Sequence, residues 1–193
     1  MIKMKIVTLQ IDGKKIDAEE GQTVFQAAKK AGIIIPSLCY HDNLEPFGAC
    51  RLCMVEIEKH NRKRLVASCC YPVEEGLVVV TRNEKIDKIR RVLSELLLAI
   101  SPSGTHAVLA KEYGITESRF ELEQNPDSPC NLCGLCVRYC KEIKKSNAVA
   151  FNGRGINKKV ALVPGVSDQC LSCRQCFTVC DAGKIVYLVD NLL

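Results

Sequence analysis

The stretch SPCNLCGLCVRYCK at residues 128–141 is repeated as DQCLSCRQCFTVCD at residues 168–181 in this chain of 193 residues. Each copy spaces four cysteines as C-x2-C-x2-C-x3-C. The eight cysteines are Cys130, Cys133, Cys136, Cys140, Cys170, Cys173, Cys176 and Cys180. The repeat predicts two equivalent thiolate sites in the C-terminal part of the chain.

The short gaps suit an iron-sulfur cubane. Gaps of two residues let three thiolates converge on one small cluster from a tight loop, while backbone N–H groups point at its sulfides. The same run holds [4Fe-4S] clusters in bacterial two-cluster ferredoxins, where the fourth cysteine binds the other cluster. It implies two crossed ligand sets, which are Cys130, Cys133, Cys136 with Cys180, and Cys170, Cys173, Cys176 with Cys140. Lys141 and Asp181 replace the proline that follows the run in those ferredoxins, which changes a local turn more than the ligand set.

Two other uses of cysteine fit less well. A zinc site takes four tetrahedral ligands from two close pairs, so a third close cysteine in each copy would be superfluous. A disulfide scaffold needs an oxidising compartment, yet residues 1–10 show no signal peptide and the total of 13 cysteines is odd. No apolar run is long enough to cross a membrane. We therefore expect a cytoplasmic protein without a membrane span.

The remaining cysteines form a separate group in the N-terminal half, namely Cys39, Cys50, Cys53, Cys69 and Cys70. Two close cysteines with one well before and one well after is the general plan of a [2Fe-2S] site. The first gap is longer than in plant-type ferredoxins. Spacing alone does not decide whether Cys69 or Cys70 is the fourth ligand.

The residues around this group resemble the N-terminal region of the complex I 75 kDa subunit, of [FeFe] hydrogenases and of NAD-linked formate dehydrogenases. The resemblance is carried by IPSLCYH at 35–41, CRLCMVEIE at 50–58 and CCYPV at 69–73. In that family the fourth ligand lies three residues before a Pro-Val pair, which implies a [2Fe-2S] cluster on Cys39, Cys50, Cys53 and Cys69. Cys70 is then an extra thiol, which we interpret as a small buried residue beside the cluster.

The resemblance also implies the architecture, which is α+β. A β-grasp [2Fe-2S] ferredoxin domain is expected over residues 1–83, a helical connector over 84–128 and a two-[4Fe-4S] ferredoxin-like domain over 129–193. The family usually carries a further [4Fe-4S] cluster, held by one histidine and three cysteines between these domains. No cysteine occurs between Tyr71 and Pro129, so we interpret His106 as an ordinary connector histidine.

The family further implies a function. Its members add a C-terminal catalytic domain, whereas this chain ends at Leu193. We therefore expect a separate, non-catalytic subunit of a cytoplasmic hetero-oligomer. It would pass single electrons between a flavin-containing NAD(P)H-oxidising subunit, resembling that of complex I, and a further catalytic redox subunit. The alternatives are a free-standing multi-cluster ferredoxin and an iron-sulfur redox sensor module.

Charge does not favour a nucleic-acid partner. The formal charge is +5 with neutral cysteines, but three thiolate-bound clusters would bring the loaded protein to roughly neutral. The basic segments at 59–64 and 141–145 contain no aromatic residue and no recognisable DNA-binding motif. We interpret them as solvated loop faces or partner-docking patches.

Hydrophobic periodicity gives a coarse secondary structure. Apolar and polar residues alternate over 7–11, and Asp12-Gly13 follows. This pattern predicts a hairpin whose second strand covers 15–18. Thr23 with Gln26 predicts a capping box for a helix over 24–31. Other expected elements are strands at 77–80, 148–151 and 160–163, helices at 84–100 and 107–113, and turn-rich breaks at 101–104 and 124–129. The apolar stripe of the helix over 84–100 is expected to pack between the two cluster domains, and the glycines at 152–155 to form a hairpin loop rather than a nucleotide site.

Overall fold

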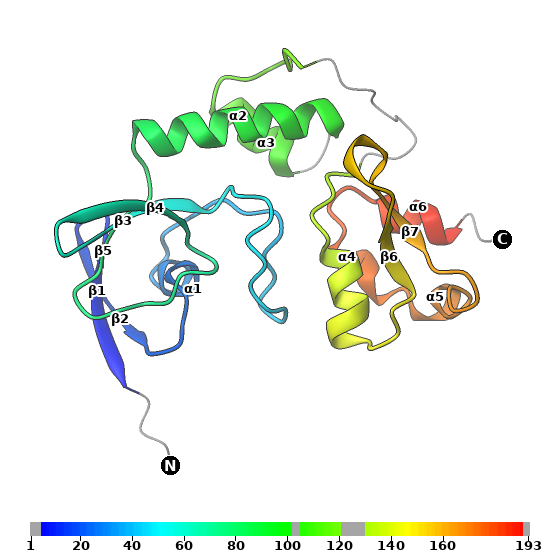
Figure 1. Cartoon of the computed structure of the whole chain (residues 1–193), viewed down its shortest axis with the longest axis horizontal. Helices are drawn as coiled ribbons and strands as arrows, with labels where there is room; N and C mark the ends of the chain where they lie inside the picture. Colours follow the sequence, from blue (N-terminus) through cyan, green and yellow to red (C-terminus); the bar gives the residue numbers. More distant parts are fainter. Residues whose placement is uncertain (1–4, 102–104, 121–129, 191–193) are drawn as a thin grey trace. The chain divides into compact units, whose positions relative to one another are not determined.

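The computed structural model describes residues 5–101, 105–120 and 130–190 (Figure 1). The chain divides into two compact units. The first consists of Met1–Tyr40 and Pro46–Leu93, and the second of His41–Glu45 and Ser94–Leu193. The predicted break at 101–104 and the predicted boundary at 124–129 lie largely outside the described residues.

The first unit is a mixed five-stranded sheet with the strand order β2-β1-β5-β3-β4. Its elements are β1 Ile6–Ile11, β2 Lys14–Glu19, α1 Val24–Lys30, β3 Met54–Lys59, β4 Arg62–Ala67 and β5 Val78–Val80. β1 pairs antiparallel with β2 and parallel with β5, while β3 pairs antiparallel with both β4 and β5. This mixed sheet with its helix is consistent with the expected [2Fe-2S] ferredoxin-like domain.

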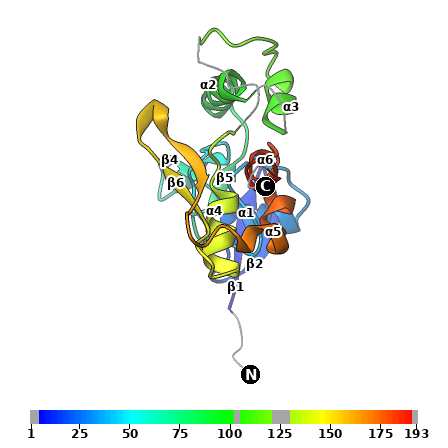
Figure 2. The same cartoon turned by 90° about the vertical axis from the view of Figure 1, so that its right-hand side faces the viewer.

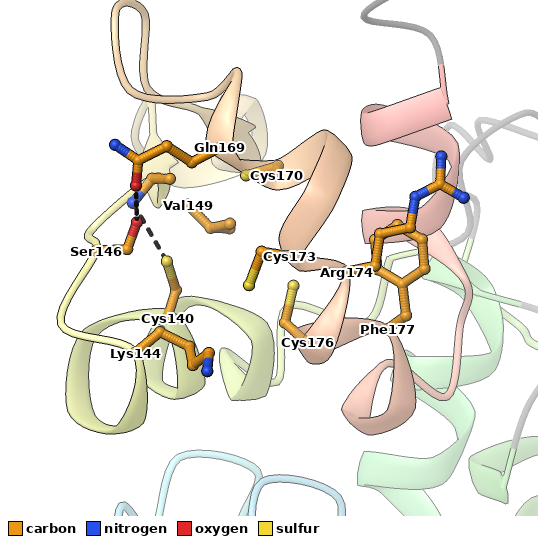
Figure 3. A pocket seen from close by; sticks show the side chains of 11 residues that line it. Cys140, Lys144, Ser146, Val149, Gln169, Cys170, Cys173, Arg174, Cys176 and Phe177 are labelled. Carbon is orange, nitrogen blue, oxygen red and sulfur yellow. Dashed lines mark hydrogen bonds between the residues drawn. The ribbon is translucent and has the colours of Figure 1, made fainter.

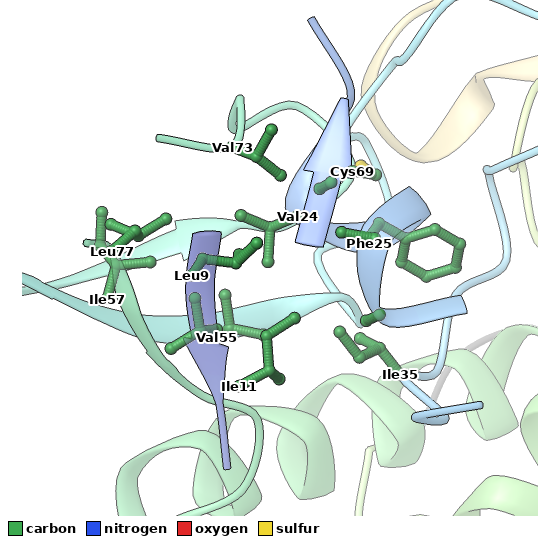
Figure 4. Close-up of a cluster of buried hydrophobic side chains, with 14 of the residues drawn as sticks. Leu9, Ile11, Val24, Phe25, Ile35, Val55, Ile57, Cys69, Val73 and Leu77 are labelled. Atoms are coloured by element: carbon green, nitrogen blue, oxygen red, sulfur yellow. The ribbon is translucent and has the colours of Figure 1, made fainter. Parts of the chain in front are cut away.

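Alternating strand residues and one helix face build the core of this unit. Figure 4 shows Leu9 and Ile11 of β1 and Val55 of β3 gathered near Val24 and Phe25 of α1, and all of these side chains are buried. Because side chains alternate across a strand, residues two apart enter the same core. The predicted hairpin and its alternation are confirmed.

The predicted capping box starts α1. The Gln26 backbone N–H donates to Thr23 Oγ1 at 3.2 Å, and the Thr23 N–H donates to Gln26 Oε1 at 2.9 Å. These bonds satisfy two amide groups that a helix start otherwise leaves without partners. Gly32 follows the helix end with a φ of +72°, which glycine adopts without steric cost.

The β3–β4 hairpin was not predicted from the sequence. Its turn residues His60 and Asn61 have φ values of 50° and 58°, which a tight hairpin usually obtains from glycine. The interpretation of residues 59–64 as a loop is therefore wrong. Arg62, Lys63 and Arg64 are nevertheless exposed, as expected for a solvated face.

The helix α2 spans Glu84–Ile100, the range that the sequence predicted. Asn83 caps it, because Asn83 Oδ1 accepts from the Ile86 N–H at 2.9 Å. Thr81, two residues earlier, donates to the Asp12 carboxylate from its N–H at 2.8 Å and its hydroxyl at 2.5 Å. A short helix follows as α3, Thr105–Glu112. The packing of the α2 stripe between cluster domains remains a prediction.

The second unit contains short helices around one hairpin. The elements are α4 Leu135–Arg138, the π-helical turn η1 Tyr139–Ile143, β6 Val149–Asn152, the 3₁₀ turn η2 Gly155–Asn157, β7 Lys159–Leu162, α5 Gln169–Cys173, the 3₁₀ turn η3 Gln175–Val179 and α6 Lys184–Asp190. β6 and β7 pair antiparallel, and α5 lies beside α6 (Figure 2). No helix in the described ranges is long and apolar enough to cross a membrane.

The glycine-containing segment between β6 and β7 is a hairpin loop, as expected. Gly153 has a φ of +77°, and a Cβ added to it would lie 2.3 Å from the Asn157 carbonyl oxygen. The loop backbone therefore closes on itself where a phosphate-binding loop would leave space for a ligand.

Candidate metal centres

The four cysteines expected to bind the [2Fe-2S] cluster come together as two close pairs in the first unit. Cys39 Sγ lies 3.4 Å from Cys50 Sγ, and Cys53 Sγ lies 3.3 Å from Cys69 Sγ. Cys50 also interacts electrostatically with Cys53, which links the pairs. Cys39, Cys53 and Cys69 are buried, and Cys50 is half-buried. The ligand assignment itself remains a prediction.

The four thiols of Cys39, Cys50, Cys53 and Cys69 are called the cage below. Hydrogen bonds lower the pKa of two of them. The Cys39 thiol donates to Cys50 Sγ and lowers the pKa of Cys50 to about 5, while it raises the pKa of Cys39. The Leu38 N–H donates to Cys50 Sγ at 3.4 Å. The contact between Cys53 and Cys69 likewise lowers the pKa of Cys53 to about 7 and raises that of Cys69. In each pair one thiol hydrogen-bonds to the other sulfur, so a metal bound by both sulfurs would displace that proton.

Hydrogen bonds fix the backbone on both sides of Cys53. The Ser68 N–H and hydroxyl donate to the Cys53 carbonyl at 3.1 and 2.8 Å. From α2, Arg90 donates through Nε to the Leu52 carbonyl at 3.0 Å and through Nη2 to the Met54 carbonyl at 2.9 Å. Arg90 is only 3% exposed, so its charge is held in the interior by these carbonyls.

Arg90 was missed by the sequence analysis. The sequence does hold one sign of its role. Arg90 lies four residues after the buried Ile86, which puts the two side chains on the same face of the helix. An arginine on an apolar face needs buried acceptors, and the loop carbonyls supply them.

The interpretation of Cys70 as a small buried residue is wrong. The side chain is exposed, and its Sγ lies 3.6 Å from Cys69 Sγ. Cys70 ends the turn after β4, where its N–H donates to the Ala67 carbonyl at 3.0 Å. The turn directs the second thiol of the doublet out of the core.

In the second unit, cysteines of one run lie near cysteines of the other. Burial raises the pKa of Cys136, and the next contributions come from Cys180, Cys133 and Cys130, with a smaller one from Cys176. The pKa of Cys130 is also raised, by burial and then by Cys180. The fourth cysteine of the second run therefore lies near the thiols of the first run.

The reciprocal crossing involves Cys140. Burial raises the pKa of Cys176 to about 12, and contributions follow from Cys140, Cys170 and Cys173. Cys170 likewise has its pKa raised by burial, then by Cys140 and Cys173. The fourth cysteine of the first run thus lies with the thiols of the second.

This second group surrounds a cavity of about 220 Å³. Figure 3 shows the side chains of Cys140, Cys170, Cys173 and Cys176 around this space. The Ala148 N–H donates to Cys140 Sγ at 3.2 Å. Four thiols, one cavity and a backbone donor aimed at sulfur form a donor set that fits a thiolate-bound cluster.

Among the described residues, no group of three or more His, Cys, Asp or Glu side chains is arranged to hold a single metal ion. A cubane needs no such group, because each of its irons takes one protein thiolate. His106 is fully buried on α3, and its Nε2 hydrogen-bonds to the carbonyl oxygen of Ser101. This backbone contact supports its interpretation as a connector histidine.

Comparisons with known proteins support a [2Fe-2S] domain in the first unit. Residues 4–84 match the family described as the 2Fe-2S iron-sulfur cluster binding domain. The NADPH-Fe(3+) oxidoreductase subunit alpha of Geobacter sulfurreducens is 32% identical over 204 residues, which cover 94% of this chain and 24% of the relative. The NADP-reducing hydrogenase subunit HndD of Solidesulfovibrio fructosivorans is 32% identical over 216 residues, which cover 95% of this chain and 36% of the relative.

Similarity to a solved structure extends over most of the chain. A crystal structure of an NAD+-reducing [NiFe]-hydrogenase in the H2-reduced state is similar with a TM-score of 0.71 and 33% sequence identity. The match covers 82% of this chain and 76% of that chain. The curated relatives are longer, and this chain spans only 24% and 36% of the two named above.

Proposed function

Because this chain belongs to the family of iron-sulfur subunits of NAD(P)H-linked oxidoreductases, we propose that it relays single electrons within such a complex. Its proposed partners are a flavin-containing NAD(P)H-oxidising subunit and a further catalytic redox subunit. A flavin accepts a hydride as two electrons, and one-electron clusters let the pair leave one at a time. We place the complex in the cytoplasm.

The proposed [2Fe-2S] ligands are Cys39, Cys50, Cys53 and Cys69. The two close sulfur pairs, at 3.4 and 3.3 Å, offer two thiolates to each of two irons. The Arg90 and Ser68 hydrogen bonds hold the loop that carries Cys53. These residues orient the ligands and restrict water at the buried side of the cage.

The proposed [4Fe-4S] ligands are Cys130, Cys133, Cys136 with Cys180, and Cys170, Cys173, Cys176 with Cys140. The proposal is supported by Cys140, which lines one cavity with Cys170, Cys173 and Cys176, and by Cys180, which contributes to the raised pKa of Cys136. Burial and neighbouring thiols raise the pKa of Cys136 and Cys170, so these groups stay protonated until a metal displaces the protons. The buried charge is then balanced by iron.

The test is anaerobic reconstitution of the purified chain. We expect about ten irons per chain, two in one [2Fe-2S] and eight in two [4Fe-4S] centres. Dithionite should reduce at least some of them, whereas NADH and NADPH should fail to reduce the isolated protein. Bound zinc, or iron near fourteen per chain, would refute the cluster assignment.

Affinity purification from the native host tests the partners. We expect a flavoprotein and a catalytic redox subunit to co-purify, and the latter would name the reaction. If no flavoprotein is recovered and the lone protein exchanges electrons rapidly with unrelated enzymes, it is a free ferredoxin instead.

A further inference from the structure

The doublet Cys69-Cys70 places two thiols at the same corner of the [2Fe-2S] cage. Cys69 Sγ is 3.3 Å from Cys53 Sγ and 3.6 Å from Cys70 Sγ. The buried sulfur of Cys69 therefore contacts both a buried thiol and an exposed one, since Cys53 is buried and Cys70 is exposed. Cys70 is the one of these three thiols that the proposed ligand set does not use.

The loop that precedes Cys50 is shaped around the Cys70 sulfur. Gly48 has a φ of +66°, and a Cβ added to it would lie 2.8 Å from Cys70 Sγ. Any side chain at this position would therefore displace the sulfur. Cys70 Sγ therefore lies in the space that a side chain at residue 48 would fill.

The turn after β4 fixes the base of both thiols. The N–H groups of Cys70 and Tyr71 both donate to the Ala67 carbonyl, at 3.0 and 3.1 Å. The backbone of the doublet is thus held, and its sulfurs move mainly by rotation about Cα–Cβ. A change between staggered rotamers moves a cysteine sulfur by about 3 Å, which is close to the 3.6 Å that separates Cys70 Sγ from Cys69 Sγ.

We propose that Cys70 is an alternative ligand of the [2Fe-2S] cluster and can take the place of Cys69 on the same iron. This inference rests on the proposed [2Fe-2S] site. In the exchange the bond from iron to Cys69 Sγ breaks and a bond to Cys70 Sγ forms. The proton of the Cys70 thiol passes to Cys69, and no iron changes its oxidation state. Ligation through the exposed thiol brings the cluster nearer to solvent, which alters its reduction potential.

Three variants test the exchange, namely Cys69→Ala, Cys70→Ala and Cys69→Ala/Cys70→Ala. After anaerobic reconstitution we expect about ten irons in Cys70→Ala and in Cys69→Ala, and about eight in the double variant. The reduced Cys69→Ala protein should keep a [2Fe-2S] electron paramagnetic resonance signal with shifted g values. Its signal should differ from that of Cys70→Ala, which should match the wild type.

Cys53→Ala is the matched control, because Cys53 has no adjacent cysteine in the sequence. It should lose two irons and the [2Fe-2S] signal. The [4Fe-4S] content of every variant reports whether the second unit is intact, and hydrogen-exchange protection of the five-stranded sheet reports whether the first unit has folded. If Cys69→Ala loses the signal as completely as the double variant, or if the double variant retains it, the exchange is refuted. A wild type without any [2Fe-2S] signal would instead refute the proposed function.

Discussion

Replacing Arg90 with methionine tests whether α2 supports the proposed [2Fe-2S] loop. Arg90 is 3% exposed and donates to the Leu52 and Met54 carbonyls at 3.0 and 2.9 Å. Methionine keeps much of the apolar stem but donates no hydrogen bond. Both carbonyls next to Cys53 then lose a charged donor in the interior.

The expected cost follows from these two contacts. A hydrogen bond to a charged group contributes about 1.5–3 kcal/mol, so the loss of both amounts to about 3–6 kcal/mol if they act independently. In a domain of about 60–100 residues, each kcal/mol lowers the melting temperature by about 4–8 °C. We therefore expect the [2Fe-2S] visible absorbance to be lost at a temperature lower by roughly 12 °C or more.

The assay is anaerobic thermal bleaching of the reconstituted protein at one fixed heating rate. Arg91→Met is the matched control, because Arg91 is exposed on the same helix and should change the midpoint little. The electron paramagnetic resonance signal of Arg90→Met should also broaden, since the Cys53 loop is less well held. Equal midpoints for the two variants would show that Arg90 does not support the cage.

Other predictions address the sheet, the thiols and the metal. Asp12→Ala removes the acceptor for the Thr81 N–H and hydroxyl and should cost about 1–2 kcal/mol, measured by the bleaching midpoint; an unchanged midpoint would contradict it. In iron-free protein the pKa of Cys50 is about 5 whereas those of Cys39 and Cys69 are raised, so iodoacetamide at pH 7 should modify Cys50 before Cys39 and Cys69. Mass spectrometry showing equal modification would refute this order. Proposed ligands are three of the eight buried residues in the core cluster of the second unit but two of the seventeen in that of the first. Iron removal should therefore abolish hydrogen-exchange protection in the second unit before it does so in the five-stranded sheet; simultaneous loss would argue against this.

Local signals in the sequence predicted much of the fold correctly. The capping box of Thr23 and Gln26 and the Asp12-Gly13 turn act within a few residues, so they can be recognised without tertiary structure. The range of α2 followed from its apolar spacing. The β3–β4 hairpin escaped detection because His60 and Asn61 take the positive φ angles that glycine usually signals.

The candidate site was predictable to the level of groups of cysteines. Spacing indicates which thiols belong together, because clusters impose short and regular gaps. The contacts of Arg90 with the loop around Cys53 join residues 36 and 38 positions apart, and no local pattern encodes them. The exposure of Cys70 likewise depends on how the turn after β4 is oriented, which its composition does not reveal.

The crossing of Cys140 and Cys180 has a consequence for biosynthesis. A chain leaves the ribosome from its N-terminus, and its domains fold in that order. All proposed [2Fe-2S] ligands, and Arg90 behind them, have been synthesised before the first thiol of the second unit. Neither proposed cubane has four ligands at that stage, and the one begun at Cys130 waits for Cys180. The maturation machinery would therefore insert one cluster early and deliver the other two together, once the second cysteine run has been synthesised.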